Sequence, residues 1–264
     1  MRRYRAALIT GASSGIGAAF ARELPPETDL VLVARDLKAL SELASELANI
    51  RRQVVTVQAD LSDDSGRRAA IDAAERQQID LLVNNAGLGH FGTAFGNPPE
   101  RERQMVEVNV LTPVVLIRAL LPGMMERAHT GKTRAGVVVV SSISAFLPVP
   151  RLATYAASKA FNLHYAEALA ADLEGQPVDV LALCPGFTNT KFGERSGMKP
   201  WMFHGAAKPE RVARAALRGL GRKRIVLVGS GSLMAPIGAR RLPRRFLSKG
   251  VVAAMKRLKR QSGA

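Results

Sequence analysis

Two side chains with the chemistry for proton transfer, Tyr155 and Lys159, lie four positions apart in the chain. On a helix, residues at this spacing share one face, so the phenol and the ammonium would lie near each other. A free tyrosine has a pKa of about 10 and is a poor base at neutral pH. Because a nearby ammonium favours the phenolate, we expect Lys159 to lower the pKa of Tyr155. Ser142, upstream of the pair, could hydrogen-bond an oxygen on which charge develops.

A glycine-rich segment, Thr10–Gly17, follows an apolar run and precedes a helical one. Its glycines at positions 11, 15 and 17 permit a tight turn and close approach of a pyrophosphate to the backbone. The N-terminus of a helix over Ala18–Glu23 would add N–H groups and the positive end of a dipole. The alternative is a glycine turn without a ligand, but the flanking strand and helix favour a dinucleotide site. The spacing, Gly-x3-Gly-x-Gly, differs from the common fingerprint Gly-x-Gly-x-x-Gly.

The elements that must position these residues can be recognised by their pattern. Along the chain, short apolar runs alternate with longer amphipathic stretches. We expect strands at Ala6–Thr10, Leu30–Ala34, Val54–Gln58, Leu81–Asn84, Gly136–Ser141, Val178–Cys184 and Ile225–Val228. Several are continuously apolar, as strands buried on both faces are. Two long helices are expected at Arg103–Arg127 and Tyr155–Leu173, and one long irregular segment at Gly193–His204. The alternation predicts an α/β fold, a single doubly wound domain with a parallel sheet of about seven strands flanked by helices.

Four groups of residues, in order along the chain, resemble the motifs of the short-chain dehydrogenase/reductase family. They are Thr10–Gly17; Asn84-Asn-Ala-Gly87; Tyr155-x-x-x-Lys159 with Ser142; and Pro185-Gly186 with Thr188 and Thr190. The resemblance covers about residues 6 to 230. It implies a Rossmann-type domain over residues 1–230, with 231–264 as a basic amphipathic extension. It also implies an NAD(P)-binding oxidoreductase that interconverts a ketone or aldehyde and an alcohol.

The resemblance also implies a role for each matching residue. Tyr155 would be the acid or base, Lys159 would also hold the nicotinamide ribose, Ser142 would stabilise the substrate oxygen, and Asn109 would anchor a proton-relay water. Asp60 would contact the adenine. The remaining expected cofactor contacts are Gly11, Ser13, Ser14, Gly15, Ile16, Gly17, Leu61, Asn85, Ala86, Gly87, Pro185, Gly186, Thr188 and Thr190.

Each catalytic candidate also has a purely structural interpretation. A tyrosine at a helix start with a lysine one turn later arises by chance, Ser142 could end a strand, and Asn109 could be an ordinary polar helix residue. A membrane-attached binding or scaffold protein with a relic cofactor site is the alternative function. The joint presence of all four residues argues against it, because a relic site has no need of them together.

Arg35 bears on which nicotinamide cofactor is bound. By resemblance, the family's NAD-selecting aspartate would fall at Ala34, and Arg35 matches the residue that pairs with the 2′-phosphate in NADP-preferring members. A guanidinium suits a phosphate well, so we expect NADP(H) over NAD(H). The alternative is a solvated loop cation. Ser14 departs from many NADP-preferring relatives, which carry Lys or Arg there, and Asp36 is expected to cap the next helix.

Large apolar residues gather in the predicted substrate loop, residues 190–208, and comprise Phe192, Met198, Trp201, Met202 and Phe203. In the family this segment folds over the substrate. Because methionine adapts to varied shapes, we expect a hydrophobic carbonyl or alcohol, such as a steroid, a fatty-acyl chain or another lipophilic compound. The alternative is that these residues only pack the loop onto the domain. His90 and Met105 match no motif and are expected to be packing or surface residues.

The formal net charge of +16 arises almost entirely from Arg211 onward, where Lys and Arg number 15 and acidic residues are absent. Arg240, Arg241, Arg244 and Arg245 alternate with apolar residues, and the pattern continues to Arg260. It predicts a basic amphipathic helix on an anionic membrane surface. A solvated extension packed on the domain is the alternative. Nucleic-acid binding is not expected, since aromatic residues are few and no nucleic-acid motif occurs.

The remaining sequence features concern compartment and assembly. Cys184 is the single cysteine and lies in an apolar run, so no internal disulfide and no metal site are expected. The sequence contains no run of about 18 apolar residues, so we expect no transmembrane helix. We expect a cytoplasmic protein, with peripheral contact at the inner face of a membrane through the basic tail. By resemblance, the helices at Arg103–Arg127 and Tyr155–Leu173 would form a four-helix interface in a homodimer or homotetramer.

Overall fold

A seven-stranded parallel sheet forms the centre of the protein in the computed structural model, which describes residues 2–203, 205–229 and 243–261. The strand order is β3-β2-β1-β4-β5-β6-β7, so the direction of winding reverses between β1 and β4. The strands are β1 (Ala6–Thr10), β2 (Asp29–Ala34), β3 (Val54–Gln58), β4 (Leu81–Asn84), β5 (Ala135–Val140), β6 (Val178–Pro185) and β7 (Ile225–Val228). Each predicted strand is present within one or two residues of its expected bounds, and the predicted fold class is confirmed.

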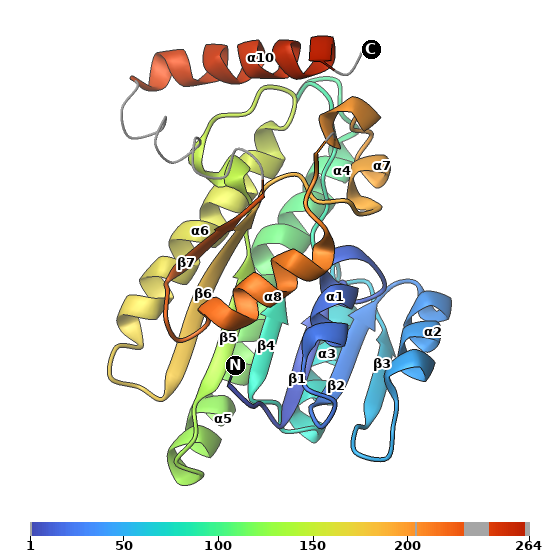
Figure 1. Ribbon diagram of the computed structural model, residues 1–264, viewed down its shortest axis with the longest axis vertical. Helices are drawn as coiled ribbons and strands as arrows, with labels where there is room; N and C mark the ends of the chain where they lie inside the picture. Colours follow the sequence, from blue (N-terminus) through green and yellow to red (C-terminus); the bar gives the residue numbers. More distant parts are fainter. Residues whose placement is uncertain (1, 204, 230–242, 262–264) are drawn as a thin grey trace.

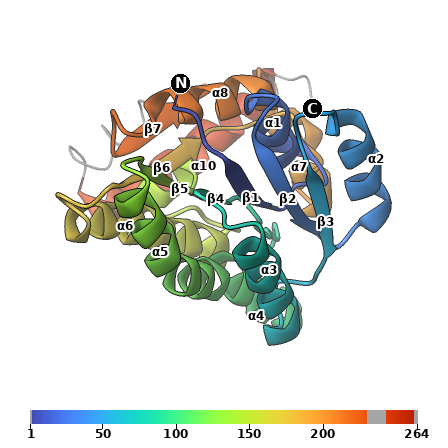
Figure 2. The same cartoon turned by 90° about the horizontal axis from the view of Figure 1, so that it is seen from below.

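Helices cover both faces of this sheet (Figures 1 and 2). The helices are α1 (Gly15–Glu23), α2 (Leu37–Leu47), α3 (Asp64–Arg76), α4 (Pro99–Val106), α5 (Thr112–Thr130), α6 (Ala153–Asp172), α7 (Phe192–Arg195), α8 (Pro209–Gly219) and α10 (Arg244–Gln261). Shorter turns are η1 (Glu107–Leu111), η2 (Ile143–Phe146) and η3 (Pro200–Phe203). Asp36 caps α2 as expected, because its carboxylate accepts a hydrogen bond from the Ala39 N–H at 3.1 Å.

The alternation of side chains along each strand creates two separate hydrophobic cores. In β1, Ala7 and Ile9 pack against α1, α2 and α8, while Ala6 and Leu8 face α3, α5 and α6. All residues of β1, β4, β5 and β6 are buried, which explains their continuously apolar sequences. The functional loops therefore emerge from a rigid sheet at the carboxyl ends of its strands.

Two expectations about connecting segments are wrong in detail. The helix expected as one element over Arg103–Arg127 consists of α4, the π-helical turn η1 and α5. The segment 193–204, expected to be irregular, contains most of α7 and all of η3 because its apolar side chains pack into a small third core. His204 lies outside the described residues.

One helical stretch, Pro99–Thr130, is long and apolar enough to cross a membrane by length and composition alone, which the sequence analysis did not anticipate. Its apolar side chains have a different explanation in the fold. Leu116, Ile117 and Met124 are buried in the core beneath the sheet. A core helix of a globular domain passes the same test, so the finding is weak support for a membrane span.

The basic C-terminal part of the chain, from Arg211 onward, begins inside the domain. Arg214 of α8 makes a bidentate pair with Glu23 of α1, with its closest N–O distance at 2.7 Å. Helix α10 then lies across the end of the molecule where the strands terminate, above α6, α7 and η3 (Figure 1). Arg240, Arg241 and Leu242 of the predicted amphipathic pattern lie outside the described residues.

Candidate active site

The turn between β1 and α1 is built so closely that only glycine fits at three positions. Gly11 and Gly15 have φ angles of +65° and +59°, which L side chains rarely adopt. A Cβ on Gly15 would lie 2.8 Å from Thr190 Cγ2, and one on Gly17 would overlap the carbonyl oxygen of Gly11. The turn thus exposes backbone N–H groups at a helix N-terminus, a cradle that fits a pyrophosphate.

Side-chain hydrogen bonds tie this turn to the segment after β4. Asn85 Nδ2 donates to the carbonyl oxygens of Thr10 and Gly11 at 2.9 and 3.2 Å. Thr10 Oγ1 accepts hydrogen bonds from the N–H groups of Asn85 and Ala86, both at 3.0 Å. The two loops at the reversal point of the sheet are therefore held as one unit, which is where ligands bind in open α/β sheets.

Arg35 and Asp60 lie together at the ends of β2 and β3. Arg35 Nη1 is 3.6 Å from Asp60 Oδ2, and the two side chains are 56% and 39% exposed. Burial alone would raise the pKa of Asp60, but hydrogen bonds from Ser62 and the charge of Arg35 hold it below its usual value. Because the guanidinium is this exposed, it is free to turn toward an anion at the mouth of the glycine turn.

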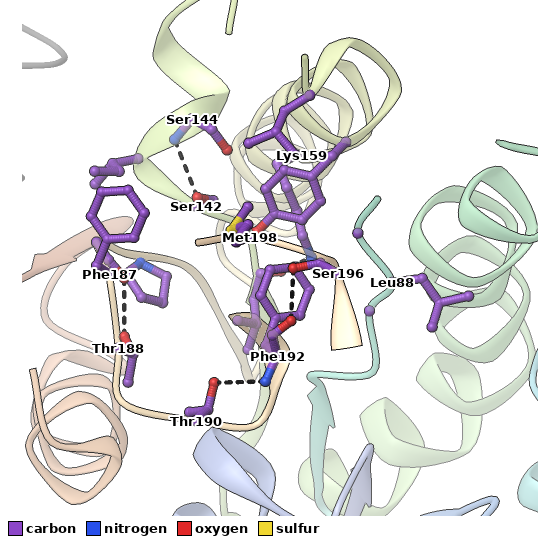
Figure 3. Close-up of a pocket in the computed structure, with 18 of the residues that line it drawn as sticks. Leu88, Ser142, Ser144, Lys159, Phe187, Thr188, Thr190, Phe192, Ser196 and Met198 are labelled. Carbon is purple, nitrogen blue, oxygen red and sulfur yellow. Dashed lines mark hydrogen bonds between the residues drawn. The ribbon is translucent and has the colours of Figure 1, made fainter. Parts of the chain in front are cut away.

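Tyr155, Lys159 and Ser142 line the same cavity beyond the carboxyl end of β5, where Figure 3 shows Ser142 and Lys159. Tyr155 and Lys159 lie on α6, and the Lys159 ammonium is 5.9 Å from the centroid of the tyrosine ring. Lys159 Nζ donates a hydrogen bond to the Val140 carbonyl at 2.8 Å. Ser142 caps η2, where its hydroxyl accepts a hydrogen bond from the Ser144 N–H at 3.2 Å. The three side chains are nearly buried, so α6 and η2 fix their positions.

The protonation of this group differs from the expectation that Lys159 lowers the pKa of Tyr155. Burial raises the pKa of Tyr155 to about 12, although the neighbouring Ser142 and Ser144 side chains lower it in part. Burial also lowers the pKa of Lys159 to about 8. The expected lowering by Lys159 is not seen in this structure, where burial dominates and the ammonium lies 5.9 Å from the ring centroid. Tyr155 holds its proton at neutral pH.

Asn109 joins three segments behind the tyrosine. Its Oδ1 accepts a hydrogen bond from the Leu88 N–H at 2.8 Å, and its Nδ2 donates to the Leu88 carbonyl at 2.9 Å. The same Nδ2 donates to Ser158 Oγ at 2.9 Å, and Ser158 in turn donates to the Tyr155 carbonyl at 2.8 Å. Asn109 thereby fixes the chain after β4 to helix α6.

A single cavity of about 840 Å³ connects the glycine turn with the tyrosine. Most predicted site residues line it, including Arg35, Ser142, Tyr155 and Lys159. Four predicted residues do not form part of its lining, namely Gly17, Asp60, Leu61 and Asn109. Gly17 acts by permitting the turn and Asn109 by holding Leu88, while the Leu61 carbonyl accepts hydrogen bonds from Thr112 and Arg67.

The apolar end of the cavity contains both predicted and unpredicted side chains. All five large apolar residues of the predicted substrate loop line it. His90 and Met105, expected to be packing or surface residues, line it too. Further lining comes from Leu88, Ile143, Ser144, Leu147, Val149, Leu152, Phe187, Ser196 and, on α10, Leu247, Gly250, Val251 and Ala254. Only proximity to Ser142 could have indicated Ile143 and Ser144, and no sequence signal points to the α10 residues.

The electrostatics of the cavity favour an anionic ligand. Arg35, Arg101 and Arg195 line it, and among the described residues no Asp or Glu does. Across residues 2–203, 205–229 and 243–261, no group of three or more His, Cys, Asp or Glu side chains could hold a metal ion. The cradle and its charge fit a dinucleotide phosphate.

Comparison with known families agrees with this geometry. The family model described as short chain dehydrogenase matches residues 5–200, which span both the glycine turn and the tyrosine–lysine pair. The chain belongs to the short-chain dehydrogenase family. As a member of that family it is an oxidoreductase.

Two curated relatives are similar in sequence to this short-chain dehydrogenase over most of its length. Dehydrogenase/reductase SDR family member 7B of Bos taurus is 32% identical over 241 residues, which cover 84% of this chain and 72% of the relative. The 1-deoxy-11-beta-hydroxypentalenate dehydrogenase of Streptomyces exfoliatus is 41% identical over 191 residues, which cover 70% of this chain and 68% of the relative.

Solved structures of similar proteins contain nicotinamide cofactors. A 3-ketoacyl-(acyl-carrier-protein) reductase from Brucella melitensis complexed with NADH has a TM-score of 0.73 at 29% identity, covering 84% of this chain and 94% of that chain. A short-chain dehydrogenase from Sphingobium yanoikuyae in complex with NADPH has a TM-score of 0.72 at 29% identity, covering 89% and 93%. This short-chain dehydrogenase thus uses a nicotinamide cofactor, for which the glycine turn and Asn85 provide the cradle.

Proposed function

We propose that the chain reduces a hydrophobic ketone or aldehyde with NADPH, and that Tyr155 donates the proton. The observation that carries the proposal is a buried phenol, protonated at neutral pH, in the same cavity as the glycine turn. A group that keeps its proton until charge develops on a nearby oxygen is suited to general-acid catalysis. The reverse oxidation uses the same groups in the opposite order.

Each catalytic residue has a distinct task in this proposal. The bound cofactor supplies the hydride that reaches the carbonyl carbon. Ser142 donates a hydrogen bond to the carbonyl oxygen as negative charge grows there, and Tyr155 transfers its proton to that oxygen to give the alcohol. Lys159, with a pKa of about 8, supplies positive charge near the tyrosine ring and would hold the nicotinamide ribose of a bound cofactor. Asn109 keeps Leu88 and α6 in place. In this proposal it would also anchor the water that returns a proton.

The proposed preference for NADPH rests on Arg35. Its guanidinium is half exposed at the end of β2, and the carboxylate of Asp60 with which it pairs is as far as 3.6 Å away. A 2′-phosphate would offer it a shorter, bidentate partner. The 2′-hydroxyl of NADH would offer neither charge nor bidentate geometry.

The proposed substrate is hydrophobic because the cavity beyond Tyr155 is mostly apolar. Tyr155 packs against Phe192 with ring centroids 5.4 Å apart, and Phe187 packs against Phe203 at 5.3 Å. Met198 and Met202 are buried in the same cluster. The names of two relatives, a hydroxypentalenate dehydrogenase and a 3-ketoacyl reductase, refer to substrates with apolar carbon skeletons.

Two further proposals concern assembly and location. Val106, Leu111 and Phe161 are 46%, 39% and 37% exposed on α4, η1 and α6, which contact one another. This apolar face is the proposed homo-oligomer interface, and Phe161→Glu should shift the molar mass measured by light scattering to that of a monomer.

The extension over 231–264 is proposed to touch anionic membranes from the cytoplasmic side. Lys249→Glu with Arg257→Glu should then abolish flotation with phosphatidylserine vesicles.

The decisive experiment for the reaction compares the wild-type chain with Tyr155→Phe. Wild type should oxidise NADPH in the presence of a lipophilic ketone, measured at 340 nm. Tyr155→Phe should lose about 1,000-fold in kcat, since it lacks the acid but keeps the ring. NADPH binding, measured by fluorescence, should change less than about twofold because the phenol only borders the cofactor. Undiminished turnover would mean a different acid, and binding without any turnover by wild type would favour a scaffold protein.

A further inference from the structure

Helix α10 forms one wall of the cavity that holds Tyr155. Leu247, Gly250, Val251 and Ala254 line the cavity, and they recur at the three- and four-residue spacing of one helix face. Leu247 is 5% exposed, and α10 contacts η3, whose Trp201, Met202 and Phe203 line the same cavity. The elements meet although forty residues separate them in the sequence. This helix lies beyond β7, the last strand of the sheet.

Gly250 is the informative residue on that wall. Glycine inside a helix destabilises it by about 1 kcal/mol relative to alanine. Close packing does not require glycine here, because a Cβ at position 250 would meet no atom within 4 Å. Gly250 lines the cavity and is exposed, with open space where its Cβ would lie, and Ala254, one turn later, is likewise exposed and lines the same cavity. Small residues on this face therefore leave volume that larger side chains would occupy.

The opposite side of α10 supplies a contrast. Ala253 and Val252 line a separate shallow hollow against Pro150 and do not line the Tyr155 cavity. Neighbouring alanines on one helix thus face different spaces. Only one of the two lies where a substrate could contact it.

We propose that α10 is the outer wall of the substrate site and that Gly250, Val251 and Ala254 determine the size of the substrate accepted. The volume they leave open suits a bulky apolar carbonyl compound with several rings or a long chain. A single-ring ketone would fill the space next to Tyr155 without reaching α10. The inference rests on the proposed reductase function for its kinetic test but not for its structural test.

The kinetic test uses Gly250→Phe and Ala254→Phe, with Ala253→Phe as the matched control. Each substrate-side variant should lower kcat/KM for a four-ring steroid ketone at least tenfold and leave kcat/KM for cyclohexanone within twofold. Ala253→Phe should leave both substrates within twofold. The four-ring and one-ring ketones report on the outer and inner parts of the same cavity. Equal behaviour of the three variants toward both ketones would overturn the proposal.

A second readout needs no turnover. Trp201 is the single tryptophan of the chain and lines the cavity beside α10. Filling the cavity with Gly250→Phe or Ala254→Phe should reduce acrylamide quenching of its fluorescence by about half, whereas Ala253→Phe should not change it. If wild type reduces no ketone, the proposed function fails, and the quenching alone then decides whether α10 closes the cavity. Unchanged quenching in both substrate-side variants would mean that it does not.

Discussion

The two ends of the cavity are built by different means. At the cofactor end, backbone atoms and glycines shape the site. Asn85 donates a hydrogen bond to a main-chain carbonyl, and the surroundings of Gly17 leave no room for a Cβ. At the substrate end, side chains from five separated segments, including α10, enclose the space. A backbone site requires particular residues at particular spacings, whereas an apolar wall can be built from many combinations. The cofactor end should therefore resist substitution and the substrate end should tolerate it.

Gly17→Ala should have the largest effect and is the strongest test of the difference between the two ends. The added methyl would overlap the Gly11 carbonyl and lie 2.6 Å from Asn85 Nδ2, so the glycine turn must open. We expect NADPH affinity to fall about 1,000-fold or folding to fail, as measured by cofactor fluorescence and circular dichroism. Gly250→Ala is the control at the substrate end and should raise stability by up to about 1 kcal/mol. Similar responses to the two alanines would remove the distinction between the ends.

Lys159 lies where the two ends meet and gives the next largest effect. Its pKa is about 8 in the folded protein and 10.5 in an unfolded chain, so below pH 8 folding buries a charge at a cost. That cost, about 3 kcal/mol, should diminish between pH 8 and 10.5, where the unfolded chain binds the extra proton, and stability should rise with pH. Lys159→Met should remove this rise in urea titrations of the cofactor-free protein. The raised pKa values of Cys184 and Tyr155 act in the opposite direction above about pH 9, so the difference between wild type and Lys159→Met is the measurement that reports on Lys159. Equal profiles of the two proteins would mean that the ammonium is well solvated.

Arg35→Ala sharpens the comparison within the cofactor end, because Arg35 is a side-chain contact in a region otherwise made of backbone. We expect the KM for NADPH to rise roughly 10- to 100-fold and the KM for NADH to change less than about twofold. The exposed Arg51, changed to alanine, serves as the control for lost surface charge. Equal effects of Arg35→Ala on both cofactors would refute the assignment.

The smallest effect should come from Met202→Leu at the substrate end. Met202 is 3% exposed, but the replacement nearly conserves volume and should destabilise the protein by less than about 1.5 kcal/mol. We expect kcat/KM for bulky ketones to change less than about tenfold, with NADPH affinity unaffected. Loss of cofactor binding in this variant would show that the two ends are not independent.

This difference also explains what could be predicted from the sequence. The strands, the glycine turn and the pairing of Tyr155 with Lys159 follow from local patterns, and each lies where it was expected. The packing of α10 onto η3 could not be predicted, because an amphipathic helix does not specify which distant apolar surface it covers. His90 and Met105 were missed for the same reason. The raised pKa of Tyr155 depends on burial, which residue spacing alone does not report.

The π-helical turn η1 has a consequence for how this protein can vary. A π turn takes in about one residue more than an α turn, and each residue of an α-helix rotates the chain by about 100°. Met105 of α4 can therefore face the cavity while Leu116 and Ile117 of α5 face the sheet, on what is otherwise one continuous rod. Deleting a single residue, such as Val110, would return the rod to regular winding. The deletion would rotate α4 relative to α5 by about 100° and withdraw Asn109 from Leu88.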